Sequence, residues 1–195
     1  MNEQPQGFRM ELVRLCRVPL QLEPQPTASQ VEAFLSKPIR PLRGLLSPER
    51  LSNPEPLIYA YNSRPHQFAR WTIQPQVRLK AEFVDQALQL EQLSCRVEGL
   101  GEWQSQLQLG LSARIRAVDH ATVGSSTGPG DAGGALLEAE ATAWGLLPAS
   151  ARPLAPVLRL ALTQLLDRME RRCHKGLRRR AEAWLVRQQR LKRLH

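Results

Sequence analysis

The chain has 195 residues, of which 42% are hydrophobic, and a formal net charge of +9 at neutral pH. This size and composition fit one globular domain with a sizeable core, and they exclude a chain that is disordered throughout. No apolar run reaches the roughly 18 residues that a membrane-spanning helix needs, and the start MNEQPQGF lacks the apolar region of a secretory signal, so we expect a cytoplasmic protein that is at most peripheral to a membrane.

The N-terminal third predicts one strand followed by short helices. Apolar residues at every second position predict a strand that begins at residue 8 and ends near residue 20, and the polar residues 1–7 predict a disordered start. Ser29 and Glu32 have the spacing of a capping box, which predicts the start of a short helix. The proline-rich stretch after this helix predicts turns and one further short helix at residues 48–51.

The middle of the chain predicts a run of antiparallel strands. The expected strands cover residues 57–62, 67–73, 77–84, 87–97, 106–118 and 136–147. The clearest of them is the strand in which apolar residues from Leu107 to Ile115 alternate with polar ones, so that one face is buried and the other meets water. The glycine-rich segment 124–134 predicts a flexible hairpin tip before the last strand.

The C-terminal part predicts one long amphipathic helix. After Pro148 the period of the apolar residues changes from two to about 3.6. The expected apolar stripe consists of Leu158, Leu162, Leu165, Met169, Cys173, Leu177, Ala181 and Leu185. Because this stripe keeps its phase across Gly176, we expect a single helix that is bent at that glycine.

This order of elements predicts an α+β helix-grip fold. In such a fold a curved antiparallel sheet, here of about six strands, has one apolar face that a long C-terminal helix covers. We expect one domain over residues 8–185 and a basic helical extension over residues 186–195. The arrangement usually leaves a cavity between the sheet and the helix.

Four segments carry a resemblance to a known family. They are FLSKPIRPLRGLLSPERL, FARWTIQPQVRL, CRVEG, and LRLALTQLLDRMERR followed by LRRRAEAW, and they occur in this order between Val31 and Trp184. In this order they resemble an uncharacterised family of cyanobacterial and plant plastid proteins, which we assign to the START-like (helix-grip, SRPBCC) superfamily. The resemblance implies a helix-grip fold, a cavity for a hydrophobic ligand, and a photosynthetic host. It implies no catalytic residues, and a fold of this kind does not by itself select a function.

No arrangement of residues in the sequence predicts catalysis or a bound metal. A metal site needs ligands that converge, and Cys173 beside His174 would point in two different directions on a helix. Glu138 and Glu140 would lie about 7 Å apart on one strand face, but that face is opposite the alanines and therefore meets solvent. The three cysteines are far apart in the sequence and predict no disulfide framework. We expect no catalytic residues, no metal and no cofactor.

A ligand cavity is predicted between the sheet and the helix. Aromatic residues gather in the first strands of the sheet and small alanines in the last, which would leave space beneath the helix. The predicted lining consists of Trp71, Phe83, Leu109, Leu111, Ala141, Leu158, Leu162, Leu165 and Met169. The alternative is that these residues form an ordinary hydrophobic core.

The whole net charge of the chain lies at its C-terminus. Residues 168–195 hold eleven Lys or Arg and two Asp or Glu, which accounts for +9 and leaves the rest neutral. A helix over residues 154–194 would be about 60 Å long, whereas a ten-residue strand spans about 33 Å, so the last turns should project beyond the sheet. The predicted contact surface consists of Trp184, Arg187, Arg190, Lys192 and Arg193. Its expected partner is an anionic membrane surface or an acidic protein, with a merely solvated helix face as the alternative. Nucleic acid is disfavoured because the chain has no recognition motif.

These observations lead to one functional hypothesis and two alternatives. We expect a non-catalytic protein that binds a hydrophobic or amphipathic small molecule such as a lipid or pigment. The first alternative is an adaptor that docks to a membrane, such as the thylakoid, or to a protein through its basic helix end. The second is a cyclase- or aromatase-like enzyme, which would require polar side chains inside the cavity. The sequence does not determine the oligomeric state.

Overall fold

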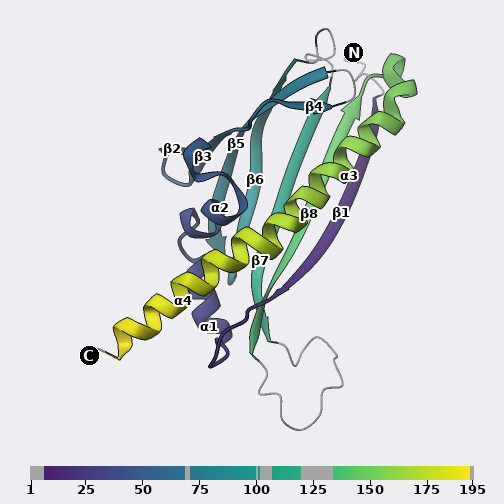
Figure 1. Ribbon diagram of the computed structural model, residues 1–195. Coiled ribbons are helices and arrows are strands. Elements are labelled where there is room, and N and C mark those ends of the chain that lie inside the picture. The colour runs from purple at the N-terminus through teal and green to yellow at the C-terminus, as the bar shows by residue number, and fades with distance from the viewer. Residues whose placement is uncertain (1–6, 69–70, 100, 102–106, 120–133, 194–195) are drawn as a thin grey trace, which may run out of the picture.

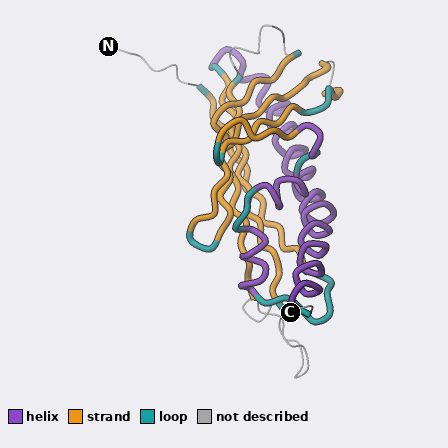
Figure 2. The backbone as a smooth tube through the Cα atoms, turned by 90° about the vertical axis from the view of Figure 1, so that its left-hand side faces the viewer, coloured by secondary structure: helices purple, strands orange, loops and turns teal. Residues whose placement is uncertain are grey.

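A computed structural model describes residues 7–68, 71–99, 101, 107–119 and 134–193. Its strands form one antiparallel sheet of eight strands in the order β1-β8-β7-β6-β5-β3-β2, with β4 paired to β5. The helices lie on one face of this sheet, and the other face is left uncovered (Figures 1 and 2). The predicted α+β helix-grip fold is confirmed, with eight strands where about six were expected.

The sheet consists of β1 (Phe8–Pro19), β2 (Leu51–Glu55), β3 (Ile58–Asn62), β4 (His66–Phe68), β5 (Trp71–Val84), β6 (Ala87–Glu98), β7 (Gln108–Asp119) and β8 (Ala135–Leu147). The helices are α1 (Ala28–Leu35), α2 (Ile39–Leu45), α3 (Ala155–Arg172) and α4 (Arg178–Lys192), with short 3-10 turns at Pro48–Arg50 and Ala149–Leu154. A π-helical turn at Cys173–Leu177 joins α3 directly to α4. The long C-terminal helix is therefore continuous, as predicted. The expected glycine-rich hairpin tip lies almost wholly outside the described residues, as do residues 1–6.

Prolines misled the prediction in two places. Two separate strands were expected around Pro75, but β5 continues through it, because proline adopts extended backbone and loses only its N–H donor. The Pro75 carbonyl still accepts a hydrogen bond from the Ser63 N–H, at 3.0 Å. The helix α2 was expected to be a turn. Pro38 and Pro41 fall at its N-cap and in its first turn, where backbone N–H groups have no partner within the helix.

The first helix is capped two residues earlier than predicted. Thr27 is the N-cap, and its hydroxyl accepts from the Gln30 N–H at 3.3 Å, while the Gln30 side chain accepts from the Thr27 N–H at 2.9 Å. The same reciprocal pattern was predicted for Ser29 and Glu32. In the helix that starts at Thr27, Val31 is fully buried.

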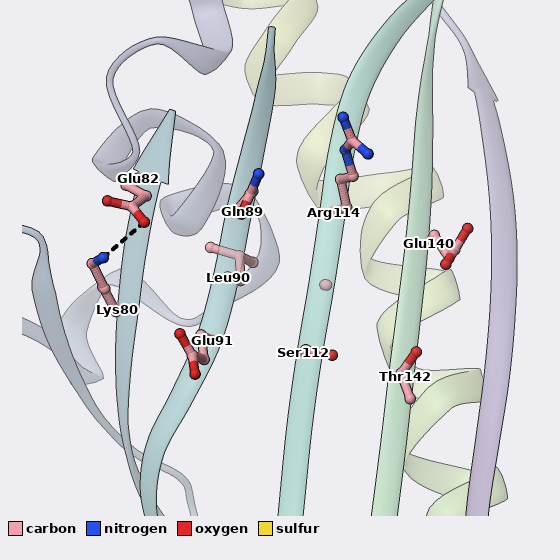
Figure 3. A pocket seen from close by; sticks show the side chains of 10 residues that line it. Lys80, Glu82, Gln89, Leu90, Glu91, Ser112, Arg114, Glu140 and Thr142 are labelled. Atoms are coloured by element: carbon pink, nitrogen blue, oxygen red, sulfur yellow. Dashed lines mark hydrogen bonds and ion pairs between the residues drawn. The ribbon is translucent and has the colours of Figure 1, made fainter. Parts of the chain in front are cut away.

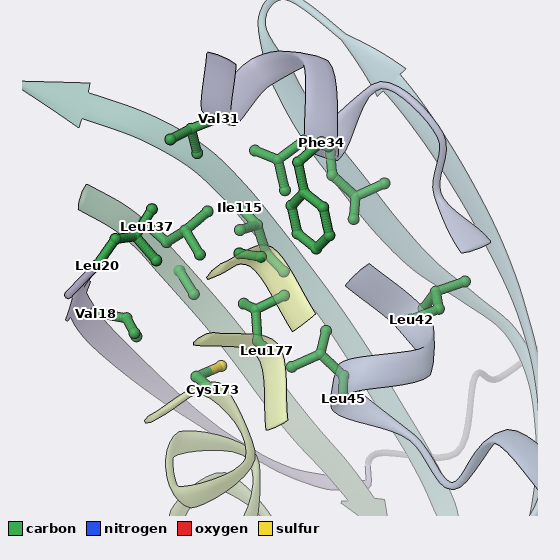
Figure 4. Packing of buried hydrophobic residues seen from close by; sticks show 14 of the residues in the cluster. Val18, Leu20, Val31, Phe34, Leu42, Leu45, Ile115, Leu137, Cys173 and Leu177 are labelled. Carbon is green, nitrogen blue, oxygen red and sulfur yellow. The ribbon is translucent and has the colours of Figure 1, made fainter. Parts of the chain in front are cut away.

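The main hydrophobic core lies where α1, α2 and the middle of the long helix meet the sheet (Figure 4). Its largest buried members are Val18, Val31, Phe34, Leu35, Leu42, Leu88, Ile115, Leu137, Leu177 and Leu185. A second cluster, beneath α3, contains Ala141, Ala143, Leu147, Leu158, Leu162 and Leu166. Leu165, which the predicted stripe included, is 39% exposed, whereas Leu166 is 1% exposed. Leu166, four residues after Leu162, faces the sheet, whereas Leu165, three residues after Leu162, does not.

Two glycines set how closely the long helix approaches α2. A Cβ on Gly176, in the π-helical turn, would lie 2.1 Å from the carbonyl oxygen of Gly44 in α2. A Cβ on Gly44 would in turn lie 2.8 Å from Cα of Leu177. The two backbones are therefore in direct contact, and the predicted irregularity at Gly176 takes the form of a π-helical turn.

The substitution Gly176→Ala should lower the free energy of unfolding by about 2 kcal/mol, because the added methyl group has no room against the Gly44 backbone. The steric cost therefore exceeds the gain of about 1 kcal/mol that alanine brings to a helix in place of glycine. Urea denaturation of the wild type and of the variant measures the change in stability. The neighbouring Lys175→Ala, at an exposed position, is the control and should change stability by less than about 0.5 kcal/mol. An unchanged or raised stability for Gly176→Ala would contradict the glycine contact.

Candidate functional site

The structure brings most of the predicted cavity residues together, but as a packed cluster. Ala141, Leu158 and Leu162 are buried, and Leu109, Leu111 and Met169 pack against them half-buried. Three predicted lining residues do not join this group: Phe83 packs against the main core, Leu165 is exposed, and the side chain of Trp71 lies outside the described residues.

The void between α3 and the sheet is small. It measures about 20 Å³ and lies above Ala113, Ala139 and Ala141, with Leu166 and Met169 forming its roof. A void of this size holds about one water molecule. A lipid or pigment of the predicted kind therefore does not fit this interface unless α3 moves away from the sheet.

Glu138 does not form the carboxylate pair with Glu140 that the sequence raised as a candidate. Both lie on the uncovered sheet face, but Glu138 is 7% exposed, not solvated as expected. Its carboxylate accepts from Arg17 of β1 at 2.9 Å and from Arg116 of β7 at 2.6 Å. The two arginines are the direct cross-strand neighbours of Glu138. Their hydrogen bonds, that of Arg116 first, lower the pKa of the Glu138 carboxyl, so this group is a structural ion-pair centre.

A polar groove of about 420 Å³ lies on the uncovered face of the sheet (Figure 3). Its polar lining comes from four neighbouring strands and consists of Lys80, Glu82, Gln89, Glu91, Ser112, Arg114, Glu140 and Thr142. Lys80 and Glu82 form an ion pair at 2.7 Å. Figure 3 shows the other side chains standing apart on their strands, so they do not converge on a common point. Acidic and basic groups are both present, which is typical of a solvated sheet face.

A smaller polar cluster lies where α3 meets the edge strand β1. Arg14 donates to Asp167 at 2.8 Å and lies 3.6 Å from Glu170. One turn further along, Cys16 contacts the Nε2 atom of His174 at 3.3 Å. Among the described residues, Cys16, Glu170 and His174 form the group whose donor atoms are close enough to share a metal ion. The sequence paired His174 only with Cys173 and therefore missed this group.

The outward side of α3 and α4 carries a row of cations. Nine exposed residues make up this cationic row: Arg168, Arg171, Arg172, Lys175, Arg179, Arg180, Arg187, Arg190 and Arg193. Arg178, on the same helix, is not part of this row. In the described part of the chain it forms an ion pair with Glu182 at 3.9 Å. The row extends over about 38 Å at 1.5 Å per residue. The last turns of α4 extend past α1 (Figure 1).

Trp184 belongs to the fold rather than to the free helix end. Its ring packs on Phe34 of α1 with a centroid distance of 6.0 Å, and the Arg40 guanidinium lies 4.7 Å above it. Arg187, Arg190 and Arg193 of the predicted contact surface are exposed, whereas the Lys192 side chain lies outside the described residues. Trp184 is therefore part of the packed fold, and exposed cations extend much further back along the helix than the predicted surface.

Comparisons with known proteins show distant likeness only. No protein-family model and no curated protein matches the chain. Norcoclaurine synthase from Thalictrum flavum is similar with a TM-score of 0.43 and 12% identity, over 87% of this chain and 96% of that one. The Zhui aromatase/cyclase from Streptomyces sp. R1128 has a TM-score of 0.44 and 12% identity, over 92% and 95%. A conserved protein from Geobacillus kaustophilus has a TM-score of 0.48 and 8% identity, over 89% and 95%. Likeness at this level carries no information about ligand or reaction.

Among the described residues, no helix is both long and apolar enough to cross a membrane.

Glu138→Gln should lower the free energy of unfolding at pH 7 by about 1.5–3 kcal/mol, the usual range for hydrogen bonds to a charged group. The pKa of Glu138 in the folded state lies below its ordinary value of 4.5, so this stabilisation is present above that pH. It is lost as the pH falls through the lowered pKa, and the difference between the two proteins should shrink accordingly. Urea denaturation between pH 7 and pH 3 tests this. The exposed Glu140→Gln serves as the control, and a difference for Glu138→Gln that grew in acid would contradict the ion-pair assignment.

Proposed function

We propose that this protein is a docking module whose long helix binds an anionic surface through the cationic row. The observation that supports this most directly is the concentration of exposed, like-charged side chains on one rigid helix, with an otherwise neutral chain behind it. Like charges repel one another, so nine cations over about 38 Å destabilise the free protein slightly. An anionic partner would relieve that repulsion. The proposal develops the docking alternative and extends its surface from the helix end to the whole outward side.

The partner we propose is an anionic membrane, because apolar side chains accompany the cations. Leu160 and Leu165 on α3 are 53% and 39% exposed, and Leu191 near the end of α4 is 45% exposed. Arginines with exposed leucines beside them are typical of helices that lie in a lipid headgroup layer. Each cation near such a surface contributes about 1 kcal/mol. The resemblance to cyanobacterial and plastid proteins makes the thylakoid the natural candidate for this membrane.

Charge reversal tests the docking function. The triple variant Arg179→Glu, Arg187→Glu and Arg190→Glu should bind vesicles of phosphatidylglycerol and phosphatidylcholine at least about 100-fold more weakly than the wild type, since each reversal removes about 1 kcal/mol of attraction and adds repulsion. Vesicle flotation at two salt concentrations provides the measurement. The wild type should bind less at high salt and not at all to pure phosphatidylcholine.

A matched control separates the helix from net charge. The variant Arg96→Glu, Arg114→Glu and Arg152→Glu changes the charge by the same amount at exposed positions outside the cationic row. It should retain most of the vesicle binding. Equal losses in both variants would mean that net charge alone drives binding. Failure of the wild type to float, together with tight binding to double-stranded DNA or to an acidic protein, would overturn the membrane as the partner.

We infer a second candidate function, the binding of a small hydrophobic or amphipathic molecule beneath α3. It is favoured by the floor of Ala113, Ala139 and Ala141, which keeps the sheet surface low under Leu166 and Met169. Arg14 at the margin of the same void could face the polar end of a fatty acid. Binding would require α3 to lift, because the void in this conformation is about 20 Å³. The cyclase- or aromatase-like alternative gains no support from these contacts and stays a prediction.

Met169→Ala should raise the affinity for oleate about tenfold, because it removes part of the roof over the alanine floor. Leu165→Ala removes a similar side chain from the exposed side of the same helix and should leave the affinity unchanged. Native mass spectrometry and tryptophan fluorescence measure the binding, and near-ultraviolet circular dichroism checks that both variants remain folded. Equal affinities of wild type and Met169→Ala, or no detectable oleate on either, would argue against a site beneath α3.

A further inference from the structure

Three side chains from two distant parts of the sequence meet at the seam between the long helix and β1. Cys16 comes from the inner face of β1, Glu170 from the last turn of α3, and His174 from the π-helical turn. Each offers one donor atom, and these atoms all lie within 4.8 Å of one another. The closest pair is the Cys16 sulfur and the His174 Nε2 atom, at 3.3 Å. A thiol, an imidazole and a carboxylate therefore face a common point.

The backbone holds these donors in place from both sides. Glu170 and His174 are four residues apart, so they project from the same face of the helix. Cys16 is 5% exposed and lies on the strand face that the helix covers. The helix position is set independently by the contact of Gly44 with Gly176, which follows His174 by two residues in the sequence. The convergence follows from the packing of the fold rather than from flexible surface side chains.

The distances suit a zinc-type ion. Zinc binds cysteine sulfur at about 2.3 Å and histidine nitrogen or carboxylate oxygen at about 2.0–2.2 Å, in tetrahedral geometry. In such a tetrahedron neighbouring donor atoms lie roughly 3.3–3.8 Å apart. The Cys16–His174 distance of 3.3 Å is already in that range, and the Glu170 carboxylate lies within 4.8 Å of both donors. We propose that Cys16, Glu170 and His174 bind a zinc-type divalent cation, with a fourth position open to water.

A basic and an acidic neighbour border this point. Arg14 lies 3.6 Å from Glu170 and donates to Asp167 at 2.8 Å, so its charge is shared between two carboxylates. Cys173 borders the same small void as Cys16 and Glu170.

The fourth position has room for one water. The void of about 20 Å³ beneath α3 borders both Cys16 and Glu170. Three protein ligands with an open fourth position are the arrangement of zinc sites that bind an exchangeable water or a small ligand. The site faces β1, away from the exposed cationic row, so it does not depend on the docking function.

Cobalt(II) titration of the reduced, metal-free full-length protein tests this proposal. The wild type should bind one equivalent and show thiolate-to-cobalt charge-transfer absorption, which zinc then abolishes by displacement. His174→Ala should weaken zinc binding at least about 100-fold, because loss of a direct ligand should exceed the 10–100-fold effect of outer partners. Cys16→Ser should abolish the charge-transfer band.

Two control variants remove the other cysteines. Cys95 lies on β6, away from the three donors, and burial raises the pKa of its thiol to about 11. The Cys95→Ser variant should therefore bind cobalt as the wild type does. Cys173→Ser should also retain the band, because Cys173 is not among the three converging donors. Since Cys16 is buried and its replacement could affect folding, the half-exposed His174→Ala keeps the test decisive. The proposal is overturned if the wild type gives no band, or if His174→Ala binds zinc as tightly as the wild type.

Discussion

The position of the long C-terminal helix depends on a contact between two backbones. Gly176 and Gly44 approach so closely that a single methyl group on either would meet main-chain atoms. This contact holds the π-helical turn against α2 and so determines which helix residues face the sheet. Leu177, Ala181 and Leu185 then enter the core beside Phe34 and Leu42. On the opposite side of the helix, the arginines and Lys175 are left in solvent.

The close approach of the helix also explains why the interior is nearly filled. A helix-grip fold offers a ligand cavity when its helix stands away from the sheet, and here only about 20 Å³ remains beneath α3. Leu158, Leu162 and Leu166 fill the space above the alanines of β8. The features with a candidate function are therefore found at the margins of the helix. They are the cationic row on its outer side and the three metal-type donors at its seam with β1.

The sheet and the long helix differ in how their charged side chains are paired. On the uncovered sheet face, Glu138 lies between Arg17 and Arg116, and Lys80 pairs with Glu82, so basic groups meet acidic ones within the fold. Such pairs stabilise the sheet and leave little net field. Along the helix after residue 167 only Glu170 and Glu182 are acidic, and Glu170 is turned toward Arg14. The cationic row is consequently a surface whose charge is not compensated by the chain itself, which is the physical basis of the docking proposal.

Periodicity along the chain determined the architecture. Alternation with period two located β1, the second half of β5, β7 and β8, and the change to period 3.6 after Pro148 located the long helix, because each element has to bury one continuous apolar face. Local sequence patterns were less informative where two different local structures fit the same proline or capping pattern. Prolines fit the first turn of α2 as well as a loop, and Thr27 competes with Ser29 for the cap. The uneven charge distribution was also evident from the sequence, and it identified the helix as the basic element.

Contacts between distant segments were decided only by the tertiary structure. Leu165 and Leu166 are equally apolar, and the register of α3 against the sheet selects Leu166 for the core. Glu138 looks like one of two solvent-facing carboxylates until β1 and β7 bring an arginine to either side. Cys16 stands 158 positions from His174 in the sequence, so no spacing rule could relate them. Periodicity reports which face of an element is buried, whereas distances between elements depend on packing, and here that packing depends on the contact between Gly44 and Gly176.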